Sequence, residues 1–163
     1  MLSSSIPLHS VGRSRGFSLM ELLIVLSILG ITVGFAFPSY LEYMAKARRA
    51  DAHIAIHQLT TAQESHYTIQ NRYTDDMAAL GPELSPEGYY SVAAYLGHTG
   101  ASGSISDCSA VASDPTATYA YTIVVTPAPG SPQAQDSECS CLFIDSRGVK
   151  GSTGTRTSAR ECW

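Results

Sequence analysis

Residues 15–38 have the sequence RGFSLMELLIVLSILGITVGFAFP. From Leu22 to Phe37 this stretch contains no charged side chain, and residues 17–21 in front of it extend the potential helix to about twenty-one residues. At about 1.5 Å per residue such a helix is roughly 30 Å long, which is the thickness of the hydrocarbon core of a bilayer. The stretch therefore predicts a membrane-spanning helix.

The charges in front of this helix predict its orientation. Arg13 and Arg15 precede the apolar run, and cationic flanks are retained on the cytoplasmic side of a membrane. We therefore expect everything after the helix to lie outside the cytoplasm. Without these two arginines the net charge changes from −4 to −6, so the exported part is acidic.

The apolar run could be cleaved on either side. An ordinary signal peptide is cut after the run, where Gly34 and Ala36 are weak candidates for a small-residue site. The alternative is a cut before the run, at the Gly16–Phe17 junction.

The residues around Gly16 favour the second alternative. The stretch RGFSLMELLIVLSILGI resembles the class III signal sequence of type IV prepilins. The resemblance implies a leader over residues 1–16, cleavage by a prepilin peptidase after Gly16, and N-methylation of Phe17. It also implies that residues 17–38 form a transmembrane helix that becomes part of a filament core.

Glu21 is the charged residue of the predicted membrane helix. A carboxylate in such a helix costs on the order of 2–3 kcal/mol, so we expect it to have a partner, unless it reaches the aqueous interface. The resemblance implies that the partner is the N-terminal amine of a neighbouring subunit, at Phe17. Opposite buried charges relieve one another only when they meet, so Glu21 is predicted to set the subunit register during assembly.

Gly30 and Pro38 interrupt the helical pattern. Proline lacks an amide donor and glycine is a poor helix former, so bending or local unwinding is expected between them. For Gly30 alone, close packing between helices is an equal alternative.

Residues 39–70 contain no further glycine or proline and predict the amphipathic half of the same helix. A cluster of Lys46, Arg48 and Arg49 follows the apolar run, and it could contact lipid headgroups, contact neighbouring pilins, or simply be solvated. Small and apolar residues recur at steps of three and four, which favours packing of one helix face on a sheet. They are Ala52, Ala55, Leu59, Ala62, His66 and Ile69.

Two histidines on this helix are candidate metal ligands. His53 and His57 are four residues apart, a spacing that can hold a divalent metal, but the pattern of a metalloprotease is absent. We expect no metal site and no cofactor. His66 lies on the apolar face and is expected to be packed or partly buried.

Residues 71–163 are expected to form a globular part of loops and sheet. Residues 71–86 carry many turn signals, and residues 97–116 and 127–138 have the composition of loops. A long helix followed by consecutive strands predicts an α+β domain in which an antiparallel meander packs on the helix. The resemblance to type IV prepilins implies the same arrangement, the type IV pilin fold. Strands are predicted over residues 89–96, 119–126 and 141–145, with a short fourth strand after a turn at residues 145–148.

The four cysteines are Cys108, Cys139, Cys141 and Cys162, and their spacing does not match a zinc knuckle. Disulfides in an oxidising compartment are the preferred interpretation. The C-terminal stretch CSCLFIDSRGVKGSTGTRTSARECW resembles the end of PilE-like minor pilins. This resemblance implies a Cys139–Cys162 bridge, which leaves Cys108 with Cys141. Since Cys139 and Cys141 point to the same side of a strand, the swapped pairing stays open.

These features predict a structural subunit, a minor pilin, rather than an enzyme. The expected location is the inner membrane of a Gram-negative bacterium and then an extracellular type IV pilus that serves twitching motility, adhesion or DNA uptake. Expected partners are other pilin subunits, the prepilin peptidase and the inner-membrane assembly machinery. A type II secretion pseudopilin is the first alternative.

A DNA-binding competence pilin is a further alternative, and the sequence favours it less. DNA binding requires a basic stripe, because contacts to phosphates supply most of the non-specific affinity. The basic residues near the C-terminus are interspersed with acids. The cations are Arg147, Lys150, Arg156 and Arg160, and the acids are Asp136, Glu138, Asp145 and Glu161.

Overall fold

The computed structural model describes residues 16–97, 108, 111, 113–156 and 159–163 of the 163-residue chain. It divides into two compact units, Met1–Tyr40 and Leu41–Trp163. Within the described residues, the first unit is helical almost throughout and the second contains the sheet. The two units are described separately.

The dominant element is the helix α1 (Leu19–Gln70), which begins in the first unit and ends in the second. It is assigned as helix through the positions of Gly30 and Pro38, so bending or unwinding there remains a prediction. The helix ends where Asn71 adopts a φ of 54°, a left-handed conformation that asparagine tolerates well. The amide of Asn71 donates to the carbonyl oxygen of Tyr67 at 2.8 Å and so closes the last turn.

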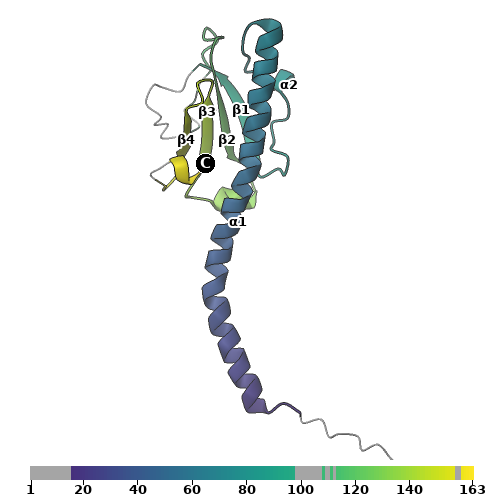
Figure 1. The fold of residues 1–163 in the computed structure, drawn as a ribbon, viewed down its shortest axis with the longest axis vertical. Coiled ribbons are helices and arrows are strands. Elements are labelled where there is room, and N and C mark those ends of the chain that lie inside the picture. The colour runs from purple at the N-terminus through teal and green to yellow at the C-terminus, as the bar shows by residue number, and fades with distance from the viewer. Residues whose placement is uncertain (1–15, 98–107, 109–110, 112, 157–158) are drawn as a thin grey trace, which may run out of the picture. The chain divides into compact units, whose positions relative to one another are not determined.

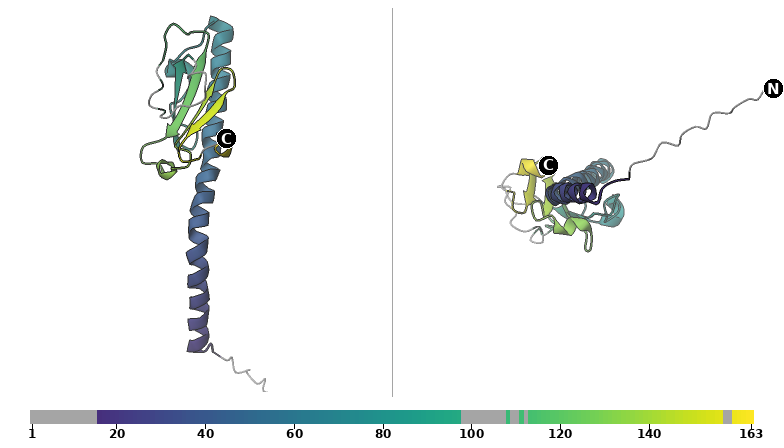
Figure 2. Two further views of the ribbon diagram at one scale, coloured as in Figure 1. Left: turned by 90° about the vertical axis from the view of Figure 1, so that its left-hand side faces the viewer. Right: turned by 90° about the horizontal axis from the view of Figure 1, so that it is seen from below.

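Four antiparallel strands form one sheet in the order β1-β2-β3-β4, as predicted. Figures 1 and 2 show these strands side by side along the part of α1 that belongs to the second unit. The third strand occupies the predicted residues, and the boundaries of the first two differ from prediction by one or two residues. The strands are β1 (Tyr90–Leu96), β2 (Tyr121–Pro127), β3 (Cys141–Asp145) and β4 (Lys150–Thr153).

The core of the second unit lies between α1 and one face of the sheet. Small and apolar residues of the helix pack in one core with residues of the strands, as the alanine-rich stripe predicted. Ile69 was expected on this buried stripe but is 75% exposed, because it lies in the last turn of the helix. Fully or nearly fully buried core residues are Ala52, Ala55, Ile56 and Leu59 of α1 and Tyr90, Val92, Ile123, Val125 and Leu142 of the sheet.

Polar side chains attach the connecting segment between α1 and β1 to the helix. The amide of the fully buried Gln63 donates to the Thr74 carbonyl at 2.6 Å, and its oxygen accepts from the Thr74 amide at 3.2 Å. The carboxylate of Asp51 accepts hydrogen bonds from the Ser85 hydroxyl and the Glu87 amide. The remaining short elements are α2 (Met77–Leu80), η2 (Pro132–Gln135) and η3 (Ala159–Glu161).

Candidate functional site

The apolar segment of α1 in the first unit is exposed along its whole length. Its large apolar side chains from Phe17 to Phe37 are 46% to 79% exposed. Exposure of this much contiguous apolar surface to water is unfavourable, so the segment requires a membrane or a partner protein around it. The helix is long and apolar enough to cross a bilayer.

The polar groups of this segment are arranged for an apolar environment. Ser27 donates to the carbonyl oxygen of Leu23 at 2.8 Å, and Thr32 donates to that of Ile28 at 2.7 Å, so both hydroxyls are satisfied within the helix. Glu21, in the first turn, has no hydrogen-bond or ion-pair partner among the described residues. A partner from outside the chain would therefore satisfy Glu21.

Gly16 and Phe17 directly precede this helix. Neither residue is helical, both are exposed, and α1 begins at Leu19. The Leu22 amide donates to the Ser18 carbonyl oxygen at 3.2 Å, so helical hydrogen bonding starts just after the Gly16–Phe17 junction. The peptide bond predicted to be cleaved is thus outside the hydrogen-bonded helix.

At the start of the second unit a buried ion pair joins α1 to the loop between β2 and β3. The guanidinium of Arg49 contacts both carboxylate oxygens of Asp136 at 2.8 and 2.9 Å, and the two side chains are 6% and 2% exposed. Asp136 also accepts from the side chain of Gln133 at 2.7 Å and from the Cys139 amide at 3.3 Å. Arg49 was predicted to belong to an exposed basic cluster. That prediction is wrong, because the Arg49 side chain is buried where it pairs with the Asp136 carboxylate.

Arg156 lies close to three carboxylates next to this pair. Its guanidinium lies 2.8 Å from Glu138, 3.5 Å from Glu161 and 3.6 Å from Glu42. The hydrogen bond from Arg156 lowers the pKa of the Glu138 carboxyl. The network therefore ties α1, the β2–β3 loop and the C-terminal turn together through one side chain.

The other basic residues near the C-terminus differ in their partners. Arg147 forms an ion pair of 2.6 Å with Asp145, and Lys150 lies 4.6 Å from the centre of the Trp163 ring. Lys46 and Arg160 are exposed, and neither has an ion-pair partner in the described part of the chain. Much of the basic character predicted for this region is thus neutralised.

Trp163 closes the end of the globular unit. Its indole stacks on the ring of His53, with 5.2 Å between ring centres, and its N–H donates to the Gly151 carbonyl at 2.9 Å. His53 Nε2 is 3.2 Å from the carbonyl oxygen of Cys162, and burial lowers the pKa of the imidazole. His57 is exposed. Among the described residues, no three His, Cys, Asp or Glu side chains gather as a metal site.

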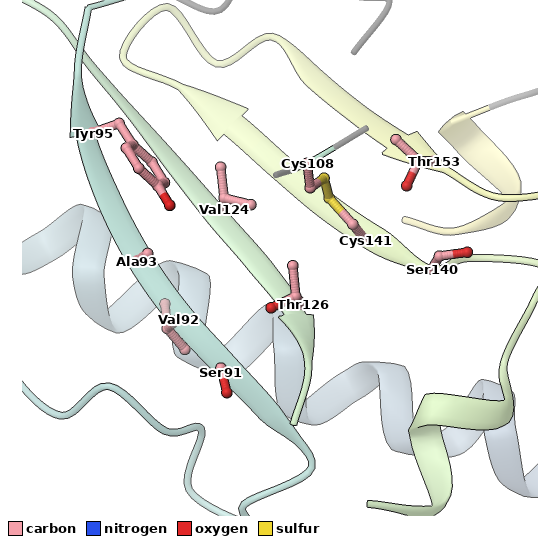
Figure 3. Close-up of a pocket in the computed structure, with 10 residues that line it drawn as sticks. All are labelled: Ser91, Val92, Ala93, Tyr95, Cys108, Val124, Thr126, Ser140, Cys141 and Thr153. Atoms are coloured by element: carbon pink, nitrogen blue, oxygen red, sulfur yellow. A yellow bond between two sulfur atoms is a disulfide. The ribbon is translucent and has the colours of Figure 1, made fainter. Parts of the chain in front are cut away.

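Two disulfides brace the sheet. Cys139 is bonded to Cys162, and Cys108 is bonded to Cys141, which is the pairing implied by the resemblance. The first bridge attaches the C-terminal turn to the segment just before β3, on the core side. The expectation that Cys139 and Cys141 point to the same side of one strand is wrong, because Cys139 lies outside β3. Figure 3 shows the second bridge on the other side of the sheet, next to Val124. It borders a pocket of about 370 Å³.

Two family models match this chain in adjacent ranges. The model for the type IV minor pilin ComP, DNA uptake sequence receptor, matches residues 38–143, and the model for the prokaryotic N-terminal methylation motif matches residues 12–37. The first match covers well over half of the chain. The chain belongs to the ComP family of type IV minor pilins.

Individual relatives of this pilin are described as pilins or fimbrial proteins. It is 36% identical over 87 residues to the type IV major pilin protein PilA of Myxococcus xanthus, a match that covers 52% of this chain and 40% of PilA. It is 30% identical over 91 residues to the fimbrial protein EcpC of Eikenella corrodens, covering 56% of this chain and 60% of that protein. The pilin thus spans about half the length of these curated relatives.

One solved structure shares part of this arrangement of elements. A type IV pilin from Shewanella oneidensis aligns with a TM-score of 0.44 and 19% identity, over 73% of this chain and 97% of the other.

Sequence reasoning did not find the ion-pair networks of this pilin. The acids Asp136 and Glu138 are separated from Arg49 by almost ninety residues, and no spacing rule links a loop to a helix across such a distance. The expected partly buried position of His66 agrees with the structure, where its Nδ1 lies 2.9 Å from the Arg72 carbonyl. The only indication of these ion pairs in the sequence is that acidic and basic residues are interspersed from residue 136 to the C-terminal end of the printed sequence.

Proposed function

We propose that this chain is a minor subunit of a type IV pilus, held in the inner membrane by its apolar helix and then transferred into a filament. The observation that carries the proposal is the exposed apolar segment from Phe17 to Phe37 with one carboxylate, Glu21, that has no ion-pair or hydrogen-bond partner among the described residues. A membrane or other apolar helices would cover the segment, and an amine from a neighbouring subunit would satisfy Glu21. The role is structural rather than catalytic.

In this proposal a prepilin peptidase cleaves between Gly16 and Phe17 and the new N-terminus is methylated. The match to the methylation-motif model over residues 12–37 supports this step, as does the non-helical backbone at the junction. The globular part is then exported by a Gram-negative cell and interacts with other pilins and the inner-membrane assembly machinery. Bending or unwinding between Gly30 and Pro38 would adapt the helix to the filament.

The first test of this proposal is the intact mass and N-terminal sequence of the chain, produced with and without a prepilin peptidase. The expected product begins at N-methylated Phe17. An uncut chain, or one cut after Phe37, would refute the prepilin assignment and remove the reason for pairing Glu21 with a neighbouring amine.

The second test concerns Glu21 itself. Glu21→Gln should lower incorporation into filaments at least about tenfold, because the neighbouring amine would be buried without its counter-charge. The control is Glu83→Gln, which removes an exposed carboxylate from the loop before β1. Equal incorporation of both variants, measured in sheared filaments, would exclude a register role for Glu21.

A second candidate function is DNA uptake, because the matched family is described as a DNA uptake sequence receptor. A receptor should bind duplex DNA with an affinity that falls steeply with salt, since each phosphate contact releases counterions. We would measure fluorescence anisotropy of labelled duplexes with the full chain in nanodiscs of neutral lipid. Absence of binding at low salt would exclude the receptor function and leave the structural role intact. The match to a pilus family also favours a pilus over a type II secretion pseudopilus.

A further inference from the structure

The face of the sheet that points away from α1 carries the pocket of about 370 Å³ beside the second disulfide. Figure 3 shows Val124 and the Cys108–Cys141 bridge among the side chains that line it. Small-molecule sites in proteins have volumes of about 300–1,000 Å³. The pocket is therefore large enough for one small organic ligand.

Hydroxyl groups make up the polar side chains of this pocket. The strand register brings several of them together, because Ser91 is the cross-strand partner of Thr126, and Thr153 is that of Cys141. Cross-strand partners have Cβ atoms about 5 Å apart, so side chains from neighbouring strands reach one pocket. The hydroxyl-bearing residues come from β1, β2, β4 and the position before β3. They are Ser91, Tyr95, Thr126, Ser140 and Thr153.

None of these five hydroxyls is used within the globular unit. In the part of the chain that the structure describes, each lacks a side-chain hydrogen bond. A hydroxyl both donates and accepts, so the set can bind ligand groups of either kind. A single exposed hydroxyl is ordinary on a solvated sheet face, but here five from four segments surround one pocket. Their partners must be water or a ligand.

The pocket is also uncharged. Among the described residues, its lining contains no aspartate, glutamate, lysine, arginine or histidine. A charged ligand would lose hydration on entering and would gain no counter-charge. The same reason argues against duplex DNA, whose affinity depends on contacts between cations and phosphates. The lining therefore fits a neutral ligand.

Apolar surface accompanies the hydroxyls. Val124 and its cross-strand partner Ala93 contribute aliphatic groups, and the Tyr95 ring packs beside Val124 (Figure 3). A tyrosine ring offers an apolar face together with a polar hydroxyl. A sugar ring has the complementary pattern, because its faces carry C–H groups and its edge carries hydroxyls.

We propose that this pocket binds the ring of a neutral hexose. The hydroxyls of Ser91, Thr126 and Thr153 would bond to those of the sugar, and Tyr95 would lie against its C–H groups. The binding itself concerns the globular unit alone and goes beyond the proposed filament role. Only its use, attachment of a pilus to a glycan that ends in such a hexose, rests on the proposed function.

The test uses the full chain in nanodiscs of phosphatidylcholine, with bound sugar detected by saturation-transfer NMR. The probes are the methyl β-glycosides of glucose, galactose, mannose and N-acetylglucosamine, each titrated through the millimolar range. At least one should bind with a Kd of about 1 mM, because a few hydrogen bonds in an open pocket give weak affinity. Methyl β-glucuronide, which carries a carboxylate, should bind at least about tenfold more weakly than the tightest neutral probe.

The variant Thr126→Val/Thr153→Val removes two of the hydroxyls and keeps the shape of both side chains. Each lost hydrogen bond should weaken binding about fivefold, so the double variant should bind about 25-fold more weakly. The matched control is Thr155→Val, which changes an exposed threonine two residues after β4 that does not line the pocket. Its Kd should equal that of the unchanged chain.

Near-UV circular dichroism verifies that the variants are folded, and Thr126→Val alone serves if the double variant is not. Absence of saturation transfer to all four neutral glycosides would refute the hexose site. Equal affinity of the double variant and the control would also refute it, and so would tighter binding of the glucuronide. The filament role would stand in each case, because it is tested at Phe17 and Glu21. A chain that binds a hexose but is not processed at Phe17 would refute the filament role alone.

Discussion

Replacement of Arg49 tests whether the buried ion pair holds the globular unit together. The proposed change is Arg49→Met, which keeps much of the side-chain volume and removes the charge. It leaves the Asp136 carboxylate, 2% exposed, without the guanidinium that contacts both of its oxygens. Glu138 loses a weaker contact of 3.3 Å at the same time.

Removal of one partner from a buried ion pair costs about 3–5 kcal/mol of unfolding free energy. The low end of that range applies here, because Asp136 keeps the hydrogen bond from Gln133 and amide bonds from Glu138 and Cys139. We therefore expect a loss of about 3 kcal/mol. If the unfolding free energy falls by about 1.5 kcal/mol per molar of urea (the m-value), the unfolding midpoint should fall by about 2 M urea.

The assay is urea unfolding of the full chain in a non-ionic detergent, followed by Trp163 fluorescence. Trp163 reports unfolding because its indole stacks on His53 and bonds to Gly151 only in the folded unit. Arg72→Met is the control, since Arg72 is exposed and its removal should cost less than about 0.5 kcal/mol. A midpoint shift for Arg49→Met no larger than that of the control would show that the ion pair contributes nothing net.

Three further predictions use the same preparation. Gly151→Ala should cost about 1–3 kcal/mol of unfolding free energy, because an added Cβ would lie 1.9 Å from the Phe143 ring. Replacing Cys139 and Cys162 by serine should lower the free energy of unfolding by about 3–4 kcal/mol, since the bridge closes a 23-residue separation. The urea midpoint measures the effect of Gly151→Ala and that of the cysteine replacements. Burial acts to raise the pKa of the Asp145 carboxyl, but hydrogen bonds from Arg147 and nearby amides outweigh burial and lower it. Asp145 should therefore stabilise the fold above about pH 4 and lose that effect as pH falls through its depressed folded pKa, and Arg147→Gln should raise that pKa in an NMR titration.

The sequence was sufficient for those features that depend on local patterns. The apolar run at residues 17–38, the helix to Gln70 and the alternating strands each follow from the composition of a continuous segment. The α+β architecture expected from these segments is confirmed, with a four-stranded antiparallel sheet on a long helix.

The approximate packing of the helix was also predictable, but its limits were not. Periodicity identified Ala52, Ala55 and Leu59 as buried, yet it extended the buried face to Ile69, which the sheet does not cover. The fully buried Gln63 was missed, because polar side chains are expected outside. Its burial depends on two hydrogen bonds to Thr74, which follow from the path of the loop rather than from the helix.

What the sequence by itself determined is therefore the class of the protein: an anchor helix with one carboxylate, a motif at Gly16–Phe17, and a small cysteine-containing domain after the helix. Only the tertiary structure decided which charges remain free. Arg49, Arg147 and Arg156 are paired, whereas Lys46 and Arg160 have no acidic partner among the described residues. The physical reason is that charge pairing depends on distances of a few ångströms between segments far apart along the chain, which local sequence patterns do not specify.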